Sequence, residues 1–82
     1  MKNRMRDLIL EVVDNQINGG DPPETATTYQ RLLKAGIKPQ EAKRLIACVV
    51  ASEIFEIQKN EQPFDHARYV KALDQLPELP LD

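Results

Sequence analysis

Glycine and proline residues interrupt the chain at four places, and these interruptions restrict the fold more than any other feature. Gly19-Gly20, Gly36 and the stretch NEQP at 60–63 each end a run with helical spacing, and Pro77 ends the last run. Between the breaks, apolar residues recur every three or four positions, and no segment alternates as a strand does. The pattern predicts an all-α fold of four helices, at about 3–18, 22–35, 39–60 and 65–76, with a tail at 77–82.

Residues at the predicted helix ends support the same division. Asp21 suits the N-cap of the second helix, with Pro22 at the first helical position and Glu24 completing a capping-box pattern. Gly36 suits the left-handed position that closes this helix, and Asp65 suits the N-cap of the fourth. We therefore expect a single helical domain over residues 1–82, a small bundle in which the helix at 39–60 is the long central one.

The size and composition of the chain are those of a small globular protein. It has 82 residues, 41% hydrophobic and 29% charged, with a net charge of −2. So short a chain buries only about 60–65% of the surface that its unfolded form exposes, and chains of this size often gain core by oligomerising. The single cysteine, Cys48, cannot form an internal disulfide, so we expect a reducing, cytoplasmic compartment. Asp7, Glu11 and Asp14 break the first apolar run, which argues against a signal peptide or a membrane span.

The predicted third helix is apolar on nearly all sides. One broad face carries its large aliphatic side chains, and the opposite face carries Ala47, Cys48, Ala51 and Phe55. A helix of this kind needs neighbours on every side. Either the other three helices cover it completely, or these four residues form an interface with a second copy or with an unidentified protein partner.

Two carboxylates lie inside this apolar helix. On a helical wheel, Glu53 falls at the centre of the main apolar stripe and Glu56 lies at its edge. A buried carboxylate needs a partner, and a fourth helix that returns antiparallel sets Arg68 and Tyr69 at about the same height. We expect Glu53 to accept a hydrogen bond from Tyr69 or from an arginine, and this contact to fix how the fourth helix docks.

Basic residues gather around the predicted turn between the second and third helices. Residues 31–44 carry five cations against one acid, Glu41, which gives a local net charge of +4; the cations are Arg31, Lys34, Lys38, Lys43 and Arg44. A helix N-terminus with cations nearby can bind an anion, so a small nucleic-acid or anion-binding module is one alternative function. The other interpretation is a solvated surface, which the negative charge of the whole chain favours.

Residues that could carry catalysis or hold a cofactor are scarce. The one histidine, His66, falls beside a predicted cap, and no glycine-rich phosphate loop is present. One cysteine and one histidine cannot build a closed zinc site, and the Glu-x-x-His pairs of helical di-metal proteins do not occur. We expect no catalytic residues, no cofactor and no metal. A carboxylate-based metal protein or enzyme centred on Glu53 and Glu56 is the remaining alternative.

A scattered set of residues spans most of 22–77: Gly36, Glu41-Ala42, Glu53-Ile54, Phe64-Asp65, Arg68-Tyr69, Leu73 and Leu76-Pro77. This set resembles small uncharacterised all-helical bacterial proteins of unknown function. The resemblance implies a bacterial cytoplasmic helical domain, and it brings no activity and no site residues. Together, the observations predict a non-enzymatic protein that acts through protein–protein contact, self-associates and does not bind a membrane.

Overall fold

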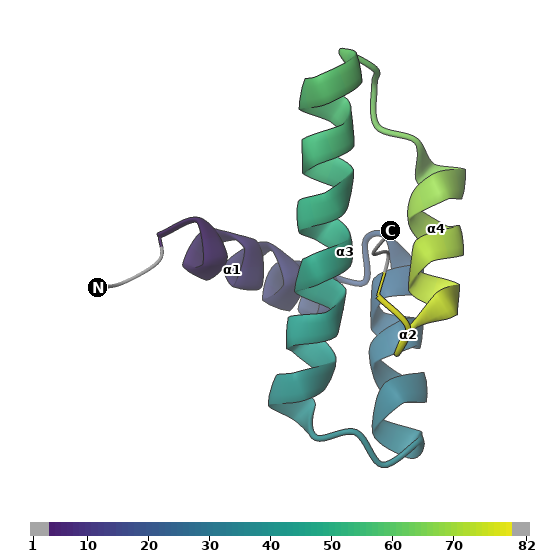
Figure 1. Cartoon of the computed structure of the whole chain (residues 1–82). Coiled ribbons are helices and arrows are strands. Elements are labelled where there is room, and N and C mark those ends of the chain that lie inside the picture. The colour runs from purple at the N-terminus through teal and green to yellow at the C-terminus, as the bar shows by residue number, and fades with distance from the viewer. Residues whose placement is uncertain (1–3, 80–82) are drawn as a thin grey trace.

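The computed structural model describes residues 4–79, which form four α-helices joined by short connections (Figure 1). The helices are α1 (Arg4–Gly19), α2 (Pro23–Lys34), α3 (Pro39–Asn60) and α4 (His66–Gln75). The predicted all-α fold is confirmed, and α3 is the longest helix, with 22 residues. None of the helices within residues 4–79 has the length and apolar character that a membrane crossing requires. The predicted helix start at residue 3 and the tail residues 80–82 lie outside the described residues.

The start of α2 differs from the prediction. Pro22, and not Asp21, is the N-cap residue, and no side-chain hydrogen bond caps the helix, so the predicted capping box with Glu24 is wrong. The ring of Pro23 crowds the residue before it and keeps that residue out of the helical region. Pro22 accordingly has an extended backbone, with φ −75° and ψ 149°, and the helix begins one residue later than expected.

Two other helix ends have the predicted chemistry. Gly36 has a φ of +92° and follows α2, and the backbone N–H of Ile37 donates to the carbonyl of Leu32 at 3.1 Å. This is the Schellman arrangement, in which a left-handed residue lets the chain satisfy the last carbonyls of a helix. At the start of α4, the Asp65 carboxylate accepts a hydrogen bond from the backbone N–H of Arg68 at 3.0 Å.

The helix α3 occupies the centre of the fold. It packs against α1, α2 and α4, and α2 also packs against α1 and α4. Figure 1 shows α2 and α4 on the same side of α3, while α1 runs across α3 at a steep angle. The buried apolar core joins all four helices, and its larger members are Ile9, Val13, Leu32, Leu45, Ile46, Val49, Val50, Tyr69, Leu73 and Leu76.

The first turns of α1 extend past α3 and away from the other helices (Figure 1). All the side chains from Arg4 to Leu8 are exposed, and burial of α1 begins at Ile9 and is complete at Val13. The second half of α1 therefore belongs to the core, while its first half forms an arm with solvent on several sides.

A buried polar cluster connects three helices inside this fold. The Tyr69 hydroxyl on α4 lies 2.8 Å from the Thr25 hydroxyl on α2, and both lie within 3.0 Å of Oε1 of Gln16 on α1. Two hydroxyl protons are shared among three oxygens, so two of the three contacts are hydrogen bonds at any one time. Burial raises the pKa of the Tyr69 phenol above its usual value, while the hydrogen bond with Thr25 acts in the opposite direction.

The raised pKa of Tyr69 predicts a loss of stability in alkali. Below pH of about 10 the phenol is protonated in both the folded and the unfolded chain; above it, the unfolded chain releases the proton more readily, so the free energy of unfolding falls. In a Tyr29→Phe variant, absorbance titration should report Tyr69 alone, with a midpoint above 10. The Tyr69→Phe variant should lose this pH-dependent component. A midpoint at or below 10 would contradict the assignment.

Candidate functional site

An open apolar groove runs between α1 and α3. It has a volume of about 720 Å³, and the apolar side chains that line it are Met5, Ile9, Leu10, Ala47, Cys48 and Ala51. The charged side chains of Arg6, Lys43 and Arg44 also border it. The groove lies in the angle between the arm of α1 and α3, and Figure 1 shows no other helix in that angle.

The predicted interface residues of α3 lie in or beside this groove. Ala47 is only 8% exposed, because α1 covers part of it, and Cys48 and Ala51 are half-buried in the groove wall. Phe55 lies further along α3, outside the lining residues, and 61% of it is exposed. The structure thus brings three of the four residues together, and it leaves the large aromatic ring in water.

The sequence interpretation missed the contribution of α1 to this surface. Within residues 4–79, six large apolar residues are exposed, and five of them lie on α1 and α3: Met5, Leu8, Val12, Ile54 and Phe55. The sequence contained a pattern that indicates exposed apolar residues on α1. The apolar residues of α1 spread over about half of the helix circumference, which is more than one packing face buries.

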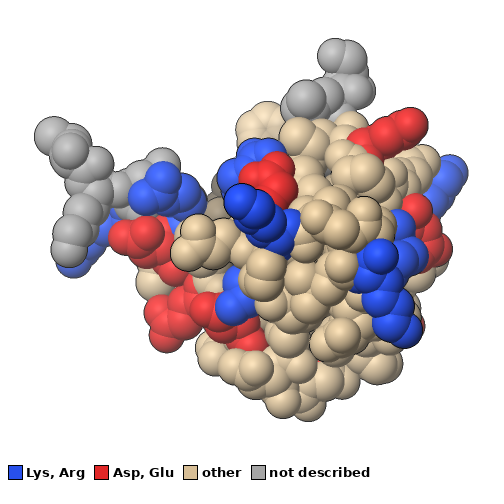
Figure 2. All heavy atoms as spheres, turned by 90° about the horizontal axis from the view of Figure 1, so that it is seen from below, with Lys and Arg blue, Asp and Glu red and all other residues tan. Residues whose placement is uncertain are grey.

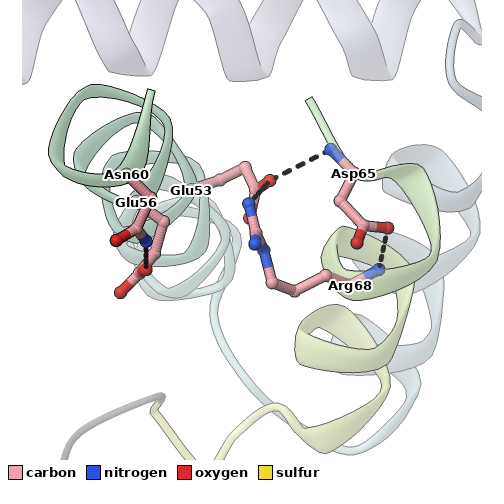
Figure 3. A network of polar contacts seen from close by, with 5 residues as sticks. All are labelled: Glu53, Glu56, Asn60, Asp65 and Arg68. Carbon is pink, nitrogen blue, oxygen red and sulfur yellow. Dashed lines mark hydrogen bonds and ion pairs between the residues drawn. The ribbon is translucent and has the colours of Figure 1, made fainter. Parts of the chain in front are cut away.

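The carboxylate of Glu53 is buried and paired with Arg68. Its side chain is 8% exposed, and it accepts two hydrogen bonds from the guanidinium, at 2.6 Å from Nη2 and 2.9 Å from Nε (Figure 3). The backbone N–H of Asp65 lies 3.4 Å from the same carboxylate. Bidentate geometry of this kind is the strongest form of an arginine–carboxylate pair. Glu53 of α3 therefore holds the first turn of α4, as the sequence predicted for an arginine donor.

The other members of the predicted polar set have different partners. Tyr69 faces Thr25 and Gln16, so the alternative hydrogen bond from Tyr69 to Glu53 is wrong. Glu56 accepts a hydrogen bond from Asn60 at 2.8 Å on the outer side of α3, directed away from Glu53 (Figure 3). Three positions set the two residues about 60° apart around the helix, so Glu53 reaches the interface with α4, while the side chain of Glu56, at the edge of that face, turns outward to Asn60.

This arrangement has little capacity to bind a metal. In the described part of the chain, no group of three or more histidine, cysteine, aspartate or glutamate side chains lies close enough to hold an ion. The carboxylate of Glu53 already faces the positive charge of Arg68, whose pKa the hydrogen bond to Glu53 raises. A cation at Glu53 would have to displace this guanidinium.

The predicted anion patch includes an arginine that performs a structural role. The Arg31 guanidinium on α2 donates hydrogen bonds to the backbone carbonyls of Leu73 and Leu76, each at 2.9 Å. These carbonyls lie at the C-terminal end of α4, where a helix has unsatisfied acceptors and partial negative charge. Arg31 therefore acts as a C-terminal cap for a helix more than forty residues away, and nothing in the local sequence indicates this role.

The remaining cations of the patch do not form one surface. Lys43 pairs with Asp14 of α1 at 2.8 Å, and Arg44 pairs with Glu41 at 2.6 Å. These contacts raise the pKa of Lys43 and lower that of Glu41. Of the five cations of the patch, only Lys34 and Lys38 make no hydrogen bond or ion pair within residues 4–79, and both are exposed. Figure 2 looks onto the α2–α3 end of the molecule, and the blue side chains there are separated by tan and red ones.

Comparisons with known proteins add no relative. No family model matches the chain, and neither does any curated protein or any solved structure. The resemblance to small bacterial helical proteins therefore stays a prediction.

The first prediction for this region concerns the Glu53–Arg68 pair. The Glu53→Ala variant should lower the free energy of unfolding by about 1–3 kcal/mol, because it removes the acceptor of two guanidinium hydrogen bonds. Glu53→Gln should lose less, since it keeps one acceptor oxygen. Thermal and urea unfolding would measure both. Glu56→Ala is the matched control and should stay within about 0.5 kcal/mol of the parent; equal losses at the two positions would contradict the assignment.

The second prediction concerns the cap on α4. Removing the guanidinium with Arg31→Ala takes one donor from each carbonyl, leaving that of Leu73 with only the backbone N–H of Leu76, and should lower the free energy of unfolding by about 1 kcal/mol. Lys34→Ala removes a cation from the same helix end and should change stability very little. Urea unfolding of both variants would compare them, and hydrogen exchange should show faster exchange at the end of α4 in Arg31→Ala alone.

Proposed function

We propose that the protein is a non-enzymatic helical module that acts through protein–protein contact and associates with a second copy of itself. The observation that carries the proposal is the apolar surface of α1 and α3, defined by Met5, Leu8, Val12, Ile54 and Phe55 and by the groove beside them. Large apolar residues scattered singly on a surface are normal, whereas an open apolar groove between two helices is typical of an interaction site.

The charges of the chain support the same proposal over the alternatives. A nucleic-acid or anion site would need cations that face solvent together, and Arg31, Lys43 and Arg44 are held in contacts within the protein. An enzyme centred on Glu53 and Glu56 would need both carboxylates at one open site, and their side chains point away from each other, one to Arg68 and the other to Asn60 (Figure 3). These contacts therefore support neither an anion site at residues 31–44 nor an enzyme centred on Glu53 and Glu56.

The small size of the protein gives self-association a physical reason. A single domain of this length has a small core, and the steep crossing of α1 over α3 leaves part of that core open. A second copy would cover it. The proposal assigns the protein to the reducing cytoplasm of a bacterial cell, in keeping with its single cysteine, Cys48.

Light scattering coupled to size exclusion tests this function. The chain should show a mass near twice 9.3 kDa at micromolar concentration. Leu8→Gln and Phe55→Gln each replace an exposed apolar side chain with a good helix former, so each should leave the monomer folded and raise the dimer dissociation constant about tenfold or more.

Phe64→Gln supplies the control. Phe64 is the one large exposed apolar residue in residues 4–79 that lies outside α1 and α3. Its substitution should leave the dimer dissociation constant unchanged. Thermal unfolding of the same variant would measure the stability lost with the ring contact between Phe64 and Tyr69. A monomer at all concentrations, or a dimer that Leu8→Gln and Phe55→Gln do not weaken, would refute the proposal.

A further inference from the structure

We propose that α3 pairs antiparallel with α3 of a second copy, with a two-fold axis close to Ala51, and that Phe55 of each chain inserts into the α1/α3 groove of the other. This inference rests on the self-association proposed above and adds its geometry. Both copies then bury the same residues, as a two-fold interface requires.

The first support is the spacing of residues on the outer face of α3. A stripe of five residues recurs there at intervals of four, three, four and three positions: Arg44, Cys48, Ala51, Phe55 and Gln58. At 3.6 residues per turn, all five fall within about 80° of the helix circumference. A repeat that averages 3.5 positions keeps its side chains turned toward one neighbouring helix along its whole length. The stripe therefore favours a helix as the occupant of the groove.

The second support is a match of shape within α3 itself. Arg44, Ala47, Cys48 and Ala51 all line the groove, and they occupy positions i, i+3, i+4 and i+7 of the helix. Four residues in this arrangement form a hole that accepts one side chain of a facing helix. Three of the four are small, so the hole has room for a large side chain. Phe55, one turn beyond Ala51, is 61% exposed and is the large apolar member of the stripe.

The heights of these residues along α3 select the antiparallel orientation. Phe55 lies about 6 Å beyond Ala51, and the centre of the hole, between Ala47 and Cys48, lies about as far before it. When two α3 helices run antiparallel about Ala51, each ring is therefore level with the hole of the other chain. A parallel pair would set Phe55 against Phe55 and would leave both holes without a large side chain.

The charges along the stripe favour the same orientation. Glu41 and Lys59 are 18 residues apart, which is five full turns, so they lie on one edge of the stripe, and both are exposed. In an antiparallel pair like edges meet, and Glu41 of each chain comes within about 3 Å of the height of Lys59 of the other. The carboxylate of Glu41 already binds Arg44 and still has acceptor sites for an ammonium group. A parallel pair would set Arg44 against Arg44 and would align the two helix dipoles.

The area that a dimer needs explains why the arm of α1 takes part. From Glu41 to Lys59 the paired faces extend over about 27 Å. A stable interface buries about 800 Å² on each partner, which is about one-seventh of the 5937 Å² surface of this chain. Met5 and Leu10 of α1 form the other wall of the groove, so a helix seated there contacts the arm as well as α3.

Cross-linking at the two-fold axis tests this geometry. In a Cys48→Ala background, Ala51→Cys places one thiol of each chain beside the axis, where closely packed helices bring Cα atoms to the separation of about 6 Å that suits a disulfide. On mild oxidation a covalent dimer should form about tenfold or more faster than with control thiols, because the dimer holds the two thiols at a high effective concentration. Non-reducing electrophoresis and mass spectrometry would measure its formation.

Two controls and one further variant accompany this measurement. In the parental chain the two Cys48 thiols differ in height by about 9 Å, which is too far for a disulfide. Asp74→Cys in the Cys48→Ala background places an exposed thiol on α4 and reports random collision. Adding Phe55→Gln to the Ala51→Cys variant should slow its cross-linking about tenfold, because no ring then fills the groove.

The outcomes separate this geometry from the proposed function. Rapid cross-linking at position 51 alone, slowed by Phe55→Gln, supports the antiparallel α3 pair. A dimer in light scattering whose thiols at position 51 react no faster than the controls, or whose cross-linking Phe55→Gln does not slow, would overturn the α3 pairing and leave self-association through another part of the surface intact. A parental chain that is monomeric at all concentrations would overturn both proposals.

Discussion

The apolar character of α3 is the constraint on which the rest of the structure depends. A helix with large apolar side chains on one face and small ones on the other is stable in water only when neighbours cover it. The helices α2 and α4 cover one side, and α1 crosses another. Because α1 crosses at a steep angle, it covers Ala47 and leaves Ala51 and Phe55 in contact with water. The same packing that builds the core thus produces the open groove.

Polar contacts determine how the helices dock around α3. The pair of Glu53 with Arg68 holds the beginning of α4, and Arg31 holds its end, so a helix of only 10 residues is tied down at both termini. Between these points, Tyr69 joins α4 to α1 and α2. Apolar packing is not directional, whereas these contacts require particular distances and angles. They select one arrangement among the many in which apolar faces could meet, and this accounts for a carboxylate in the apolar stripe.

The surface left by this arrangement links the fold to the proposed function. In residues 4–79, Arg31, Lys43 and Glu53 are engaged in structural contacts, whereas several large apolar side chains on α1 and α3 are exposed. An exposed apolar surface of this kind is costly in water and favours association.

The sequence by itself determined the number of helices, most of their ends and the identity of the central helix. Gly36 and Asp65 act through their own backbone and immediate neighbours, so local rules were sufficient for them. Periodicity also placed Glu53 in the core, because burial follows from position on the helix. Only the tertiary structure decided that Arg31 caps α4, that Tyr69 faces Thr25, and that α1 crosses α3 so as to leave Leu8 exposed. These features join residues far apart in the chain, and they depend on crossing angles that arise when side chains from several helices pack together.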